Sequence, residues 1–122
     1  MNKFLLIFLT CTFLSLHMHA ESMDSLALTP PMGWNSWNCF SCNINEAQIR
    51  EIADLMVSTG MRDAGYVYLN IDDCWQVARA EDGTILVDKK NFPSGIKALA
   101  DYIHSKGLKF GVYSCAGSLT CA

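Results

Sequence analysis

The sequence lacks an excess of basic charge, a long apolar run after its first residues, and any repeated or low-complexity segment. Lys and Arg number 9 against 12 Asp and Glu, which gives a net charge of −3 in a chain of 122 residues. Nucleic-acid binding depends largely on neutralising phosphates, so this balance argues against a nucleic-acid partner. After residue 16 no apolar stretch approaches the roughly 20 residues that a membrane-spanning helix needs. The composition is that of one globular domain at most.

The first 20 residues have the layout of a secretory signal peptide. Lys3 places a positive charge before an apolar stretch at residues 4–16, and Ala20 offers a small residue for cleavage. That stretch is too short for a membrane span. We therefore expect residues 1–20 to be removed, and the mature protein to be secreted or delivered to a lysosome-like or vacuole-like compartment without a membrane anchor.

Five cysteines follow the predicted cleavage point: Cys39, Cys42, Cys74, Cys115 and Cys121. In an oxidising compartment an odd number means that at least one thiol is unpaired or has a partner outside this chain. Cys39 and Cys42 have the spacing of half a zinc site, but no second close pair follows them, and secretion favours disulfides. We therefore expect no metal and no cofactor.

Apolar spacing predicts alternating strands and helices. A short extended run is expected at 31–37, followed by a loop. A helix should then begin after Asn45, with Gln48 completing a capping box, and end near Gly60. Its apolar side chains repeat at i, i+3, i+4 and i+7, at Ile49, Ile52, Ala53 and Met56.

The second half of the chain repeats this alternation. A strand at 66–71 is apolar on both faces, a loop carries Glu81, Asp82 and Gly83, and another strand is expected at 108–114. Between the loop and that strand lies a second helical face, with Pro93 and Ser94 before it and Gly107 after it, formed by Ile96, Leu99, Ala100 and Ile103. The order β-α-β-α-β predicts right-handed crossovers and a parallel sheet. Three parallel strands cannot close into a barrel, and the outer edge of the third strand would lack its next neighbour. We therefore expect a fragment of a larger α/β fold.

The segment Asn70 to Trp75, reading NIDDCW, places two aspartates at the end of the second predicted strand. Active sites of parallel α/β folds collect at this end of the strands. Both carboxylates can reach one pocket only if the strand ends there and the backbone turns, because strand side chains alternate between faces. The alternative is that Asp72 and Asp73 only cap a turn.

Several strings then resemble the N-terminal part of secreted α-galactosidases (melibiases), in the glycoside hydrolase family that also contains α-N-acetylgalactosaminidases. They are LTPPMGWNSWNCF, AGYVYLNIDDCW, FPSGIKALADYIHSKGLKFGVYS and AGSLTCA, and together they extend over residues 26–122. The resemblance implies an exo-acting retaining hydrolase on a (β/α)8 TIM barrel with a C-terminal β domain. Residues 21–122 would then be the N-terminal part of the barrel, about three strands of it.

The resemblance also assigns roles to individual residues. Trp37 matches the tryptophan that stacks on the galactose ring, Asp72 and Asp73 match the pair that binds its O4 and O6 hydroxyls, and Tyr113 matches a pocket tyrosine. We place Cys121 among the substrate-binding residues as well. The residues alone leave other roles open, because Trp37 could be a core side chain and periodicity favours core packing for Tyr113.

The cysteines match the family only in part. The resemblance implies a disulfide between Cys42 and Cys74. Cys121 matches a cysteine whose partner in the family lies just after the fourth strand, beyond Ala122. Cys39 and Cys115 stand where familiar members of the family have other residues, and they could pair with each other or with a cysteine further along.

Retaining glycosidases need two carboxyl groups about 5 to 5.5 Å apart, one as nucleophile and one as acid/base. Adjacent residues of a strand point to different sides, and the resemblance makes Asp72 and Asp73 binding residues. We therefore expect the catalytic pair to lie beyond Ala122 and this fragment to be inactive alone.

The sequence leaves three alternative functions for the complete protein. The first is an α-galactosidase that acts on glycans with terminal α-galactose, with a homodimer left open for the full-length protein. The second is an α-N-acetylgalactosaminidase or β-L-arabinopyranosidase of the same family. The third is a secreted galactose-binding protein without catalysis.

Overall fold

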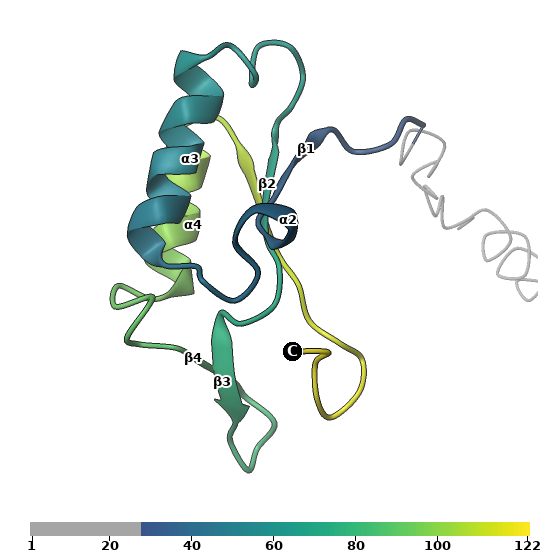
Figure 1. Ribbon diagram of the computed structural model, residues 1–122, viewed down its shortest axis with the longest axis vertical. Helices are drawn as coiled ribbons and strands as arrows, with labels where there is room; N and C mark the ends of the chain where they lie inside the picture. The colour runs from purple at the N-terminus through teal and green to yellow at the C-terminus, as the bar shows by residue number, and fades with distance from the viewer. Residues whose placement is uncertain (1–27) are drawn as a thin grey trace, which may run out of the picture.

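The computed structural model describes residues 28–122, which form a three-stranded sheet with helices packed against one face and a separate hairpin (Figure 1). The sheet contains β1 (Gly33–Asn35), β2 (Tyr68–Ile71) and β5 (Lys109–Val112), in the order β1-β2-β5. Both pairings are parallel, which confirms the predicted β-α-β-α-β order. The signal peptide predicted at residues 1–20 lies outside the described residues.

Helix α3 (Glu46–Ser58) begins and ends as predicted. Asn45 Oδ1 accepts a hydrogen bond from the Gln48 backbone N–H at 3.0 Å, and Gln48 Oε1 accepts one from the Asn45 N–H at 3.0 Å. This reciprocal pair satisfies two backbone donors that the first helical turn would otherwise leave without partners. Gly60 follows the helix at a φ of 81°, a conformation that glycine adopts without steric cost.

The core lies between the two longer helices and the sheet. Helix α4 (Ile96–Ser105) buries Leu99 and Ile103, and β2 buries Leu69 and Ile71 on the face that the helices cover. The apolar faces predicted for the helices therefore meet the sheet and each other, which fixes the positions of the strand ends. No helix within residues 28–122 has the length and apolar character needed to cross a bilayer.

Two elements differ from the sequence prediction. Residues 31–37 are not one extended run, because β1 ends at Asn35 and Trp37 begins the short helix α2 (Trp37–Phe40), where the Phe40 N–H donates to the Ser36 carbonyl at 2.9 Å. The predicted loop around Asp82 is instead the turn of an antiparallel hairpin between β3 (Gln76–Arg79) and β4 (Ile85–Val87). Both elements are too short to produce a clear apolar period.

Candidate functional site

The carboxyl ends of β1, β2 and β5 lie side by side. The Ser36 N–H donates to the Asn70 carbonyl at 3.2 Å, and the Tyr113 N–H donates to the Ile71 carbonyl at 2.9 Å. Figure 1 shows that the β3–β4 hairpin and the C-terminal segment leave the sheet at this same end. The side chains that the sequence suggested for a site follow directly after these strands: Trp37, Asp72, Asp73 and Tyr113.

Asp72 is half-buried and has one protein donor on each carboxylate oxygen. Its Oδ2 accepts a hydrogen bond from Asn35 Nδ2 at 3.0 Å, and its Oδ1 accepts one from the Asp73 N–H at 2.9 Å. Its own N–H donates to Ser36 Oγ at 2.9 Å. A carboxylate oxygen can accept about two hydrogen bonds, so both oxygens of Asp72 can still accept from a ligand hydroxyl.

Asp73 is enclosed, with a fractional exposure of 3%. Its Oδ1 accepts hydrogen bonds from the Cys74 N–H at 2.8 Å and from Gln76 Nε2 at 2.9 Å. Its Oδ2 accepts one from the Ala122 N–H at 3.0 Å, and the Thr120 side chain bonds the same carboxylate. The two neighbouring aspartates therefore differ: Asp72 faces solvent in part, while Asp73 joins its own turn to the C-terminal segment.

Two opposing effects act on the pKa of Asp73. Burial disfavours the charged form, but the hydrogen bonds from Cys74, Ala122, Thr120 and Gln76 together outweigh it and hold the pKa below its ordinary value of 3.8. The carboxylate is consequently ionised at neutral pH. Because each donor prefers the ionised acceptor, folding and ionisation of Asp73 favour each other.

This linkage predicts a pH-dependent loss of stability for Asp73→Asn. The folded pKa is the lower one, so the stabilisation is fully present above the unfolded pKa and disappears as the pH falls through the folded pKa, below 3.8. We expect the variant to lose about 1 to 3 kcal/mol of unfolding free energy near neutral pH. The deficit should shrink as the pH is lowered below about 4. Urea unfolding at several pH values measures it, with the exposed Asp101→Asn as the matched control. Equal stability of wild type and Asp73→Asn at neutral pH would contradict this assignment.

The tryptophans fall into different environments. Trp37, the first residue of α2, keeps 38% of its surface exposed. Trp75 is buried at 6% exposure and donates from Nε1 to the Tyr113 carbonyl at 2.8 Å, which joins the ends of β2 and β5. Trp34 packs against Phe40 with 5.9 Å between ring centroids. Trp37 is therefore not a core side chain among the described residues.

Tyr113 is half-buried and lies beside Cys121. Its hydroxyl donates a hydrogen bond to Cys121 Sγ at 3.7 Å. This bond, together with burial and the nearby acidic groups, raises the pKa of Tyr113 to about 12. The phenol is protonated at neutral pH, so it can donate a hydrogen bond but carries no charge. The exposed thiol of Cys121 thus contacts one of the other predicted binding residues.

The structure confirms the disulfide between Cys42 and Cys74, whose Cα atoms are 5.1 Å apart. It joins the segment after α2 to the turn after Asp73. Cys74 has a φ of 72°, which is unusual for a residue with a side chain, so the disulfide belongs to a constrained turn. A Cys39–Cys115 pair is not formed, since both thiols are free. Within residues 28–122 no three His, Cys, Asp or Glu side chains gather in a way that could hold a metal ion.

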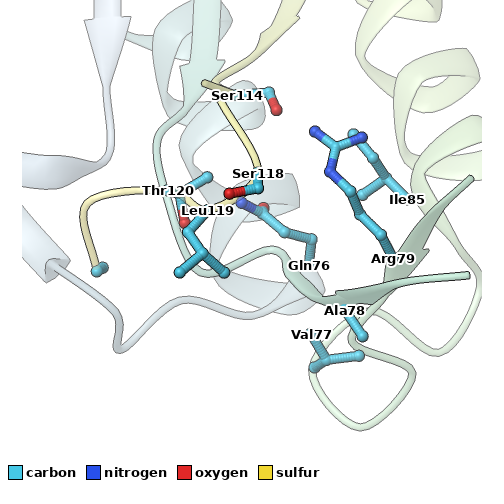
Figure 2. Close-up of a pocket in the computed structure, with 10 residues that line it drawn as sticks. Gln76, Val77, Ala78, Arg79, Ile85, Ser114, Ser118, Leu119 and Thr120 are labelled. Atoms are coloured by element: carbon cyan, nitrogen blue, oxygen red, sulfur yellow. The ribbon is translucent and has the colours of Figure 1, made fainter. Parts of the chain in front are cut away.

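A pocket of about 280 Å³ lies next to the donors of Asp73. Figure 2 shows Gln76 and Arg79 extending from β3 toward the segment that carries Ser114 and Ser118. Gln76 Oε1 is buried there without a hydrogen-bond partner, while Nε2 of the same amide donates to Asp73. Neither Trp37 nor Asp72 lines this pocket, so it is distinct from the surface that the sequence predicted.

Three polar residues of this region were not assigned a role from the sequence: Asn35, Ser36 and Gln76. A signal for the first two was present. Asn35 ends β1 and Ser36 follows it, β1 is parallel to β2, and the carboxyl ends of neighbouring parallel strands meet at one edge of a sheet. Gln76 offered no such signal, since it reaches Asp73 across a turn in which Cys74 has a positive φ, which no local pattern indicates.

The fold and these side chains define an α/β protein with a carboxylate and an exposed aromatic ring at the ends of parallel strands. The family described as "Alpha galactosidase A" matches residues 29–122, and the chain belongs to this family. Alpha-galactosidase A of Cellvibrio japonicus is 59% identical over 108 residues, which are 88% of this chain. Alpha-galactosidase 2 of Arabidopsis thaliana is 59% identical over 100 residues, or 81% of this chain.

Solved structures agree with this assignment. Alpha-galactosidase I from Mortierella vinacea superposes with a TM-score of 0.76 at 50% identity, covering 82% of this chain and 25% of that one. The Saccharomyces cerevisiae enzyme with raffinose gives a TM-score of 0.75 at 43% identity, covering 79% of this chain and 21% of that one. The chain spans about a quarter of the length of the curated relatives it matches, 27% of the Cellvibrio protein and 25% of the Arabidopsis protein.

Proposed function

We propose that the complete protein is an α-galactosidase that releases terminal non-reducing α-D-galactose with retention of configuration. The observation that carries this proposal is the family match over residues 29–122, together with Trp37 and Asp72 at the ends of neighbouring parallel strands. The three strands would be the first part of a (β/α)8 barrel, with the sugar at the carboxyl ends of the strands.

The chemistry of these side chains suits a galactose unit. The exposed indole of Trp37 can cover the apolar C–H face of the ring, and the free acceptor positions of Asp72 can take hydrogen bonds from hydroxyl groups. Galactose and glucose differ at the 4-hydroxyl, and a site whose acceptor is left unpaired by the wrong sugar rejects that sugar. In this proposal Asp72 and Asp73 bind the O4 and O6 hydroxyls, with Asp72 the more accessible of the two.

Asp72 and Asp73 are not a catalytic pair in this proposal. A retaining mechanism needs two carboxyl groups facing each other across the scissile bond, about 5 to 5.5 Å apart. The two carboxylates instead bond different segments, Asp72 to Asn35 and Asp73 to Cys74 and Ala122. The nucleophile and the acid/base are assigned instead to other parts of the complete protein.

The substrate class and the location are part of the same proposal. Raffinose is bound by the Saccharomyces cerevisiae relative, and we assign oligosaccharides with a terminal α-galactose to this protein as well. The Cys42–Cys74 disulfide supports an oxidising compartment, as expected if residues 1–20 direct secretion.

Hydrolysis by the protein expressed from its complete reading frame tests the function. Nitrophenyl α-D-galactoside, α-N-acetylgalactosaminide and β-L-arabinopyranoside are compared by kcat/KM, and proton NMR identifies the first anomer released. We expect the galactoside to be preferred and α-galactose to appear first. Preference for another glycoside would replace the assignment with that enzyme of the family. Galactose binding without hydrolysis would favour a sugar-binding protein.

A further inference from the structure

The side chain of Asn35 connects two of the residues that the proposed function assigns to the sugar, Asp72 and Trp37. Its Nδ2 donates to Asp72 Oδ2 at 3.0 Å, while its Oδ1 accepts from the Trp37 N–H at 2.9 Å. One planar amide therefore bonds both the carboxylate at the end of β2 and the backbone of the aromatic residue after β1. The two ends of this connection are otherwise 35 positions apart in the sequence.

A local turn explains only half of this geometry. An asparagine oxygen that accepts from the N–H two residues on is a common way to begin a turn, and it needs nothing beyond residues 35–37. The bond from Nδ2 reaches a residue 37 positions away and adds nothing to that turn. Its acceptor is a carboxylate oxygen, and hydrogen bonds to carboxylates are stronger than those between neutral groups.

The neighbouring Ser36 completes the attachment of Asp72. Its Oγ accepts from the Asp72 N–H at 2.9 Å, so the end of β1 bonds both the backbone and the side chain of Asp72. Ser36 is fully buried, whereas Asn35 is exposed. Replacing Asn35 consequently removes no core packing, and the effect should fall on the direction of the Asp72 carboxylate.

We propose that Asn35 is a positioning residue that fixes the Asp72 carboxylate relative to the segment after β1 that carries Trp37, and so sets the affinity for the galactose unit. This inference rests on the proposed function. A carboxylate free to rotate would have to lose that freedom on binding, and a displaced one would meet the hydroxyl at a poorer angle. Asn35 itself does not contact the reacting atoms.

Asn35→Asp separates the two hydrogen bonds of this amide. The introduced carboxylate still accepts from the Trp37 N–H, so the turn is kept, but it cannot donate to Asp72 and adds a like charge beside it. We expect KM for nitrophenyl α-galactoside to rise roughly tenfold near pH 6.5, with kcat changed less than about threefold, since the loss affects sugar binding. The defect should diminish toward pH 4.5, where a larger fraction of the introduced carboxyl group is protonated and able to donate.

Asn38→Asp is the matched control, because Asn38 is exposed on α2, three positions further on, and the change in charge is the same. It should retain the KM and the pH profile of the wild type. Thermal melting of each variant measures the folded fraction.

A wild-type KM for Asn35→Asp in an active enzyme would overturn the inference and leave the proposed function intact. So would a reduced kcat with an unchanged KM and a lowered Tm, which indicates a structural role. An inactive wild type would overturn both.

Discussion

Asp72→Asn is expected to lower kcat/KM of the complete protein on α-galactosides by roughly 10- to 150-fold, while the Tm stays within about 2 °C of the wild type. The substitution keeps the shape of the side chain but replaces a charged acceptor by a neutral one. A hydrogen bond to a charged group contributes about 1.5 to 3 kcal/mol, which corresponds to this range. Because Asp72 is only half-buried, the loss of charge should cost little stability.

Asp101→Asn is the control for this experiment. Asp101 lies on the exposed face of α4 in an i,i+4 pair with Lys97, with a side-chain exposure of 62%. Such exposed pairs contribute at most about 1 kcal/mol, so neither the kinetics nor the Tm should change greatly. If Asp72→Asn keeps the wild-type kcat/KM but melts at a lower temperature, Asp72 caps a turn and does not bind the sugar.

Removing the Cys42–Cys74 disulfide by a double substitution to serine should destabilise the protein by about 2 to 4 kcal/mol. The bond closes a loop between residues 32 positions apart, and it fixes the turn in which Cys74 has a φ of 72°. Without it the unfolded chain gains freedom, and the turn that carries Asp73 loses a constraint. A decrease in Tm of roughly 5 to 10 °C is expected.

Cys39→Ser serves as the comparison, because Cys39 is exposed and unpaired. It should melt with the wild type. Galactoside hydrolysis measured below the melting range shows whether the site also depends on the bond. A double variant that melts with the wild type would show that the other contacts of this turn suffice, among them those of Asp73.

The two longer helices, α3 and α4, and the central strand of this fold could be predicted from local patterns. The Asn45–Gln48 capping box and the apolar repeat of α3 depend on residues within one helix, and β2 is short, apolar and followed by Asp72. The hairpin could not be predicted. Val77 is 65% exposed and Leu86 is 42% exposed, so its strands lack the alternation that marks a half-buried strand.

The candidate site, too, could be predicted from the sequence only in part. The position of the aspartate pair was predicted from the end of a short strand and the turn after it, and the structure has the pair there. Trp37 is exposed, while its contact with the sugar stays a prediction. The difference between Asp72 and Asp73 could not be predicted, because it depends on Ala122, 49 positions after Asp73. The link from Asn35 to Asp72 likewise needs the register of β1 on β2, which no local pattern contains.

A crystal structure of the complete protein with bound galactose would show whether Trp37 and Asp72 bind the sugar. We expect the sugar ring to lie against the indole of Trp37, with a carboxylate oxygen of Asp72 within about 3 Å of a ring hydroxyl and Asn35 Nδ2 still bonded to the same carboxylate. Galactose bound elsewhere, with solvent over Trp37 and Asp72, would contradict it.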